Sequence, residues 1–177
     1  MGLCFEVRPT HVAEDDSGTN GPEAMVLANA RLKSSTLAES VPDALVLGSD
    51  TTVAIDGAVL SKPRDLDEAY AMLRKLSGRK HEVYTAVALN WKRGGLEESF
   101  VERSEVEFFD LDAARIKEYF DRVDPLDKAG AYGIQEGREL IIKSVSGSVE
   151  NVMGLPIQRL AGLLKELGMN FSDSKES

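Results

Sequence analysis

An acidic residue that follows an apolar run is the first candidate for chemistry in this chain. Asp50 lies in the segment Gly48-Ser49-Asp50-Thr51-Thr52-Val53, and Lys62 comes shortly after it within Ser61-Lys62-Pro63. We interpret 44–47 as a buried strand that delivers Asp50 to its carboxyl end, where open α/β sheets bind ligands. A carboxylate and an ammonium beside one cleft suit a substrate that carries phosphate and a metal ion. A strand-end aspartate is also a common turn former, so this alternative stays open.

Three further polar patches fall in predicted loops or on a predicted helix. Glu14 belongs to the acidic stretch 14–16, Lys33 lies on a helix, and Asp127-Lys128 leads towards Gln135. Loops on a rigid scaffold often carry binding groups, but each patch taken alone is also explained as solvated surface. For Lys33 the pattern does not distinguish a solvated position from one that reaches inward to a phosphate.

Several common catalytic motifs are absent from the sequence. There is no G-x-x-x-x-G-K-[ST] phosphate loop, no G-x-G-x-x-G fingerprint and no serine in a G-x-S-x-G elbow. Cys4 is the only cysteine, so it can form no internal disulfide, and no Cys/His cluster has zinc spacing. We interpret His81 as a hydrogen-bonded structural residue rather than a catalytic one. These features disfavour covalent catalysis.

Length and charge limit the classes of protein to consider. The 177 residues suffice for one core, and we expect a single domain over residues 1–170 with a flexible tail over 171–177. The net charge of −9 argues against non-specific binding to nucleic acid or to an anionic membrane. No signal peptide and no apolar run long enough to cross a bilayer is visible. We therefore expect a cytoplasmic protein in a reducing compartment.

Hydrophobic periodicity predicts the elements that position these residues. The pair Asp56-Gly57 predicts a two-residue hairpin, and Met25, Ala28 and Leu32 are predicted to form the inner face of the first helix. Strands and helices alternate but a long antiparallel hairpin interrupts them, which favours a mixed sheet with helices on its faces. The expected strands are 3–7, 44–47, 81–91, 96–109 and 140–145, the expected helices are 22–39, 65–76, 116–123 and 156–167, and loops are expected at 11–21 and 126–135.

Several of these stretches in series resemble the Maf family of nucleoside triphosphate pyrophosphatases. The similarity covers nearly the whole chain, and the motifs together are much more specific than any one tripeptide. The segments that carry it are Gly48-Ser49-Asp50-Thr51, Ser61-Lys62-Pro63, Leu73 to Gly78, His81 to Thr85, Asp127 to Gln135 and Gly154-Leu155-Pro156.

The resemblance implies an α/β fold with a twisted mixed β-sheet in two lobes around a cleft, and a homodimer. It further implies a divalent metal cation, Mg²⁺ or Mn²⁺, and hydrolysis of a nucleoside triphosphate to monophosphate and pyrophosphate. Asp50 matches the family's proton acceptor, and Glu14 and Asp50 are the implied metal ligands. Thr51 and Gln135 match positions linked to base choice, and Lys33, Lys62 and Lys128 match polar cleft positions. The motif forms resemble the branch that takes dTTP and UTP.

The chain departs from the family pattern at its beginning. Family members begin with an additional strand and a Ser-x-Ser-x-Arg-Arg loop, whereas Gly2 to Val7 matches the family segment on the C-terminal side of that unit. The resemblance then predicts either a start downstream of the true one or a shortened relative with weak or no activity. Such a relative would bind nucleotide or a cell-division partner without hydrolysis.

Overall fold

The computed structural model describes residues 5–169, and within them five strands form one sheet. Every neighbouring pair of strands is antiparallel, so the α/β class is confirmed but the sheet in this part of the chain is not mixed. Short hairpins connect two of the pairs, and strands joined in this way must run antiparallel. The strands are β1 (Val46–Ile55), β2 (Ala58–Leu60), β3 (Lys80–Trp91), β4 (Leu96–Phe108) and β5 (Ile142–Ser146), in the order β2-β1-β3-β4-β5.

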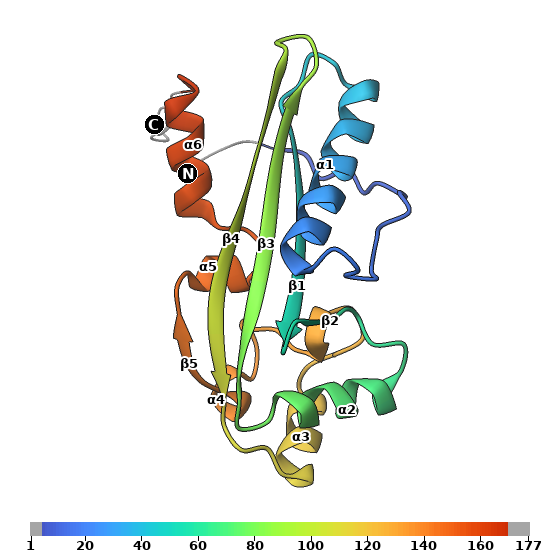
Figure 1. Cartoon of the computed structure of the whole chain (residues 1–177), viewed down its shortest axis with the longest axis vertical. Helices are drawn as coiled ribbons and strands as arrows, with labels where there is room; N and C mark the ends of the chain where they lie inside the picture. The colour runs from blue at the N-terminus through green and yellow to red at the C-terminus, as the bar shows by residue number, and fades with distance from the viewer. Residues whose placement is uncertain (1–4, 170–177) are drawn as a thin grey trace, which may run out of the picture.

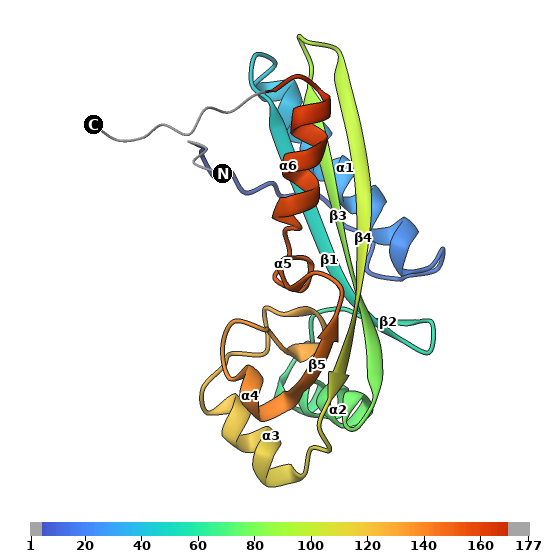
Figure 2. The ribbon, with the colours of Figure 1, turned by 90° about the vertical axis from the view of Figure 1, so that its left-hand side faces the viewer.

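The long strands β3 and β4 run through two lobes (Figures 1 and 2). In one lobe, α1 (Pro22–Ser40) and α6 (Ile157–Glu166) cover opposite faces of the sheet. In the other lobe, α2 (Leu66–Leu76), α3 (Ala113–Phe120) and the short α4 (Arg138–Ile141) surround the largest cluster of buried apolar side chains. The expected arrangement of two lobes is therefore present.

Helix α1 begins at Pro22, whose fixed φ and missing N–H suit a first helical turn. Its extent agrees with the prediction, but its inner face does not. Met25 is buried as expected, whereas Ala28 and Leu32 are exposed. The inner face consists instead of Met25 and its buried apolar neighbours, which pack on β3, and of the polar Asn29, which contacts Asp50 of β1.

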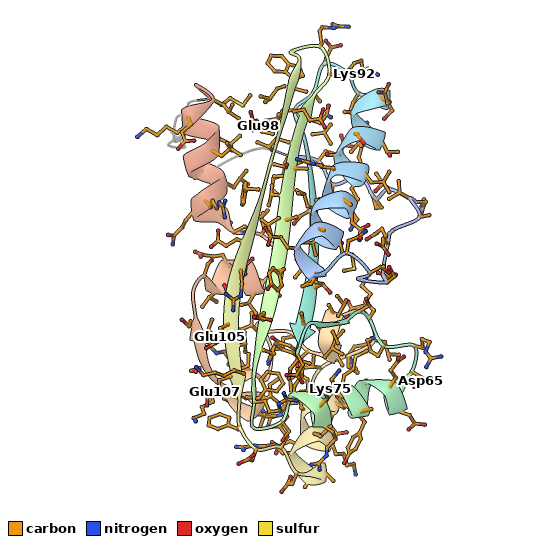
Figure 3. All side chains as sticks on the ribbon, in the orientation of Figure 1. Asp65, Lys75, Lys92, Glu98, Glu105 and Glu107 are labelled. Atoms are coloured by element: carbon orange, nitrogen blue, oxygen red, sulfur yellow. The ribbon has the colours of Figure 1, made fainter. Side chains whose placement is uncertain are left out.

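Helix α2 confirms the capping signal in the sequence. The Asp65 side chain, which lies at the beginning of the helix in Figure 3, accepts a hydrogen bond from the backbone N–H of Glu68 at 2.8 Å. The residues on the predicted inner face divide into a buried set, Ala69, Leu73 and Leu76, and a largely exposed set, Leu66 and Tyr70.

The predicted hairpins are confirmed. Asp56 and Gly57 connect β1 to β2, with Ile55 opposite Ala58. The strands β3 and β4 form one long antiparallel pair. On β4, Val106 and Phe108 are buried, whereas the alternating Glu105 and Glu107 are partly exposed (Figure 3).

The strand expected at 3–7 is wrong for the residues that the structure describes. Residues 5–7 pair with no strand, and Phe5 and Val7 are 83% and 76% exposed. Without a neighbouring strand to satisfy its backbone groups, alternation alone does not make a strand. Cys4 and the predicted tail at 171–177 lie outside the described residues.

Short helical segments escaped prediction because they are too brief to show a helical period. They are α4, α5 (Val149–Val152) and a 3₁₀ turn at Ala129–Ala131, which interrupts the expected loop at 126–135. No helix among residues 5–169 has the length and apolar character needed to span a membrane.

His81 belongs to the core, as its interpretation as a structural residue predicts. It is 1% exposed, its Nε2 lies 2.7 Å from the Tyr132 hydroxyl, and its ring packs edge-on against Phe108. Its Nδ1 has no hydrogen-bond partner within the described part of the chain. Burial lowers the pKa of His81 from 6.5 to about 4, so the folded protein holds a neutral imidazole.

We expect this histidine to make the protein sensitive to acid. Between pH 6.5 and 4 the unfolded chain binds a proton at His81 that the folded protein excludes, so the stability falls as the pH falls through this window. The loss is of the order of 3 kcal/mol. Denaturant unfolding at pH 7 and pH 4.5 should therefore show a smaller difference in His81→Gln than in the wild type. The exposed His11 supplies the control, because His11→Gln should leave the difference unchanged.

Candidate active site

All the candidate residues of the sequence line one cleft. Its volume is about 740 Å³, and it lies between the loop at 12–16, helix α1, strand β1 and the loop at 127–136. The residues in question are Glu14, Lys33, Asp50, Thr51, Lys62, Lys128 and Gln135. The structure therefore brings together groups that span more than half of the sequence.

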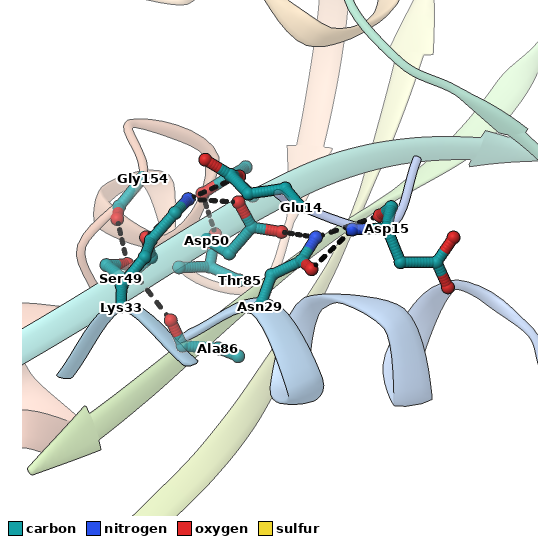
Figure 4. A network of polar contacts seen from close by, with 10 residues as sticks. Glu14, Asp15, Asn29, Lys33, Ser49, Asp50, Thr85, Ala86 and Gly154 are labelled. Atoms are coloured by element: carbon teal, nitrogen blue, oxygen red, sulfur yellow. Dashed lines mark hydrogen bonds and ion pairs between the residues drawn. The ribbon is translucent and has the colours of Figure 1, made fainter. Parts of the chain in front are cut away.

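Asp50 lies in the middle of β1, so its expected place at the carboxyl end of a strand is wrong. It is paired with Ala86 of β3, and the strand continues to Ile55. Thr51, Thr52 and Val53 favour extended backbone, and nothing in the segment ends the strand after Leu47. In an antiparallel sheet the ligand site is not at a common carboxyl edge, and Asp50 reaches the cleft from the face of the sheet that α1 covers (Figure 4).

The ammonium of Lys33 joins two carboxylates in this cleft (Figure 4). Its Nζ lies 2.7 Å from Oε2 of Glu14 and 2.7 Å from Oδ1 of Asp50. The three side chains are largely shielded, with exposed fractions of 34% for Glu14, 21% for Lys33 and 12% for Asp50. Lys33 therefore takes the inward alternative that the sequence left open.

Burial and hydrogen bonding shift the pKa values of this pair. Burial raises the pKa of Asp50, and the opposing contacts with Lys33 and Asn29 do not reverse the shift. Burial alone would lower the pKa of Lys33, but its hydrogen bonds to Asp50 and Glu14 outweigh that effect, and the pKa is raised. Lys33 thus stays charged, and Asp50 is a better proton acceptor than an exposed aspartate.

Asn29 is part of the site, although it was not predicted from the sequence. Its Nδ2 donates to Oδ2 of Asp50 at 3.1 Å and to the backbone oxygen of Asp15 at 2.9 Å. Its Oδ1 accepts from the backbone N–H of Asp15 at 2.9 Å. This amide fixes the loop that carries Glu14 and orients Asp50 (Figure 4). The spacing of four residues to Lys33 on one helix was the available signal.

The close approach of α1 to β1 depends on Gly48. A Cβ at this position would lie 2.4 Å from the backbone oxygen of Ala30 and 2.8 Å from the backbone nitrogen of Ser34. The helix backbone therefore packs directly on the strand. This contact sets the distance between Lys33 on the helix and Asp50 on the strand.

The loop at 127–136 brings further polar groups to the cleft. Gly130 has a φ of +68°, and a Cβ there would lie 2.9 Å from Val53, so the loop lies tightly against β1. The Lys128 ammonium pairs with Asp127 at 2.7 Å, whereas Lys62 forms no ion pair among residues 5–169. Gln135 is exposed at the cleft.

The opposite side of β1 presents uncharged groups. Alternate residues of a strand face opposite sides, so Ser49 and Thr51 point away from the α1 side. The Ser49 hydroxyl donates to the Gly154 backbone oxygen at 2.9 Å, and Thr51 Oγ1 lies 2.9 Å from Thr85 Oγ1. The groups that Ser49 and Thr51 contact on this side are therefore uncharged, although the charged Asp127, Lys128 and Glu136 of the loop at 127–136 also line the cleft.

Within residues 5–169, no group of three or more acidic, histidine or cysteine side chains could enclose a metal ion. The carboxylates of Glu14 and Asp50 nevertheless lie close enough together for both to contact one cationic group, the Lys33 ammonium. Mg²⁺ is commonly held by one or two carboxylates while waters and substrate phosphates complete its coordination. The donor set fits such an ion when it binds together with a phosphate substrate.

The sequence matches the family described as Maf-like protein over residues 1–167. The dTTP/UTP pyrophosphatase of Carboxydothermus hydrogenoformans is 44% identical over 164 residues, which cover 93% of this chain and 88% of the relative. That of Bacillus cytotoxicus is 43% identical over 162 residues, covering 92% and 84% of the two chains. That of Anaeromyxobacter dehalogenans is 45% identical over 170 residues, covering 95% and 86%.

Proposed function

This chain belongs to the Maf family, and we propose that it hydrolyses dTTP and UTP to the nucleoside monophosphate and pyrophosphate. The observation that carries the proposal is the partly buried Glu14–Lys33–Asp50 cluster in a cleft that Lys62 and Lys128 also line. A polyanionic substrate needs local positive charge in a protein whose net charge is −9. The names of the relatives support the choice of substrates.

The reaction needs an oriented water and stabilisation of negative charge. Asp50 accepts the proton of the water that attacks the α-phosphorus, and the bond from that phosphorus to the bridging oxygen breaks. Lys62 and Lys128 neutralise the phosphate oxygens and the departing pyrophosphate. Asn29 and Lys33 hold Asp50 in the orientation that this proton transfer requires.

We assign the binding of a divalent cation, Mg²⁺ or Mn²⁺, to Glu14 and Asp50. When bound, such an ion supplies positive charge at the phosphoryl oxygens. Lys33 also contacts both carboxylates and offsets part of their negative charge. We assign contacts with the base to Thr51 and Gln135. The family resemblance also supports a cytoplasmic homodimer. Sedimentation velocity would test the oligomeric state.

A coupled phosphate assay tests the activity. The purified protein is incubated with dTTP, UTP, CTP or GTP and with Mg²⁺ or Mn²⁺, and orthophosphate is measured with and without added inorganic pyrophosphatase. We expect orthophosphate from dTTP and UTP only when the pyrophosphatase is present. Release without it would indicate cleavage at the terminal phosphate, and binding of dTTP without any turnover would favour a non-catalytic nucleotide-binding protein.

A further inference from the structure

A directed chain of hydrogen bonds begins at the Thr51 hydroxyl. Thr85 Oγ1 donates to the backbone oxygen of Asn151 at 2.8 Å. A hydroxyl has one proton, so Thr85 cannot also donate to Thr51. The proton in the 2.9 Å contact between the two hydroxyls therefore comes from Thr51.

These hydrogen bonds use the only proton of the Thr51 hydroxyl. Towards the cleft, the hydroxyl of Thr51 can therefore only accept a hydrogen bond. Thr85 and Asn151 are both fully buried, so water does not compete for their hydrogen bonds. Asn151 is itself held in place, because its Nδ2 donates to the Val83 backbone oxygen at 3.1 Å and to Ser104 Oγ at 2.9 Å. The direction of the Thr51 proton is thus set by the folded protein before any ligand binds.

The placement of Thr51 makes it a contact for a base rather than for phosphate. Asp50, Glu14 and Lys33 gather on the α1 side of the strand, and Thr51 points to the other side. The cleft residues near the end of α5, Val152 to Gly154, carry no charge. A triphosphate requires the charged groups of the cleft, which leaves the uncharged part beside Val152 to Gly154 for the base.

We propose that Thr85 and the Asn151 carbonyl fix the Thr51 hydroxyl as an acceptor and thereby select bases that present a ring N–H. Uracil and thymine carry a proton on N3, whereas N3 of cytosine is an acceptor and would face another acceptor. Thr85 is a positioning residue, because it acts through Thr51 and does not touch the base. The inference rests on the proposed function in that it places a nucleotide in the cleft.

The affinities of two uncleavable analogues test this selection without requiring turnover. The probes are α,β-methylene-UTP and α,β-methylene-CTP, and isothermal titration calorimetry with Mg²⁺ measures both. The wild type should bind the uridine analogue more tightly. Thr85→Val removes the acceptor for the Thr51 proton, so Thr51 can donate to cytosine, and the ratio of affinities should fall about ten-fold. Thr85→Ser keeps the hydroxyl and should restore the ratio.

Thr52→Val is the matched control. Thr52 is a neighbouring threonine, 1% exposed, whose Oγ1 has no hydrogen-bond partner in the described part of the chain. Its replacement should leave the ratio unchanged. No preference in the wild type, an unchanged ratio in folded Thr85→Val, or an equal shift in Thr52→Val would overturn the inference. If the protein bound the uridine analogue selectively but cleaved no triphosphate, the proposed pyrophosphatase activity would be wrong and the proposed selection of the base would still hold.

Discussion

Asp50→Asn should lower kcat for dTTP by about 10²- to 10⁴-fold, the range that loss of a general base commonly produces. The amide has nearly the shape of the carboxylate but cannot accept the proton of the attacking water. Steady-state kinetics with saturating Mg²⁺ measures the effect. An unchanged kcat in this variant would show that Asp50 is not the proton acceptor.

The loss of activity should occur without loss of the fold. Burial raises the pKa of Asp50, which means that its charged form is less favourable in the folded protein than in the unfolded chain at neutral pH. Lys33 also keeps its second partner, Glu14, at 2.7 Å. We therefore expect a Tm equal to or above that of the wild type.

Asp56→Asn is the control for this substitution. Asp56 lies at the end of the same strand in the hairpin turn, where its φ of 54° is one that asparagine adopts readily. It pairs with Arg79 on the surface and does not line the cleft. Its kcat should equal that of the wild type.

Gly48→Ala should damage stability and activity together. The added Cβ would lie 2.4 Å from the Ala30 backbone oxygen, and a helix backbone cannot rotate away as a side chain can. Overpacking of this kind costs about 1–3 kcal/mol. Helix α1 carries Lys33 and Asn29, so its displacement moves both relative to Asp50. A misplacement of about 1 Å can lower activity by about 100-fold.

Thermal unfolding and kcat/KM measure the two effects. Gly162→Ala is the matched control, because Gly162 lies in α6 and a Cβ there meets no atom within 4 Å. It should raise the stability by about 0.5–1 kcal/mol and leave kcat/KM unchanged. If Gly48→Ala behaved like Gly162→Ala, the direct packing of α1 on β1 would not be what positions Lys33.

The sequence by itself determined the family and the main elements. The family resemblance, drawn from motifs such as Gly48-Ser49-Asp50-Thr51 and Asp127 to Gln135, is confirmed by the match over residues 1–167. The extents of α1, α2, β3 and β4 were also predicted, because each depends on a local pattern of apolar spacing, capping or turn residues. The Asp56-Gly57 hairpin is of the same kind.

Only the tertiary structure decided how these elements use their polar residues. Asp50 lies within a strand rather than at its end, and the polar Asn29 shares the inner face of α1 with buried apolar side chains. The Thr51 proton is directed by Thr85 and by Asn151, which is 66 residues beyond Thr85 along the chain. Hydrogen-bond partners and packing distances between segments so far apart depend on how the chain folds back on itself, and no local pattern encodes them.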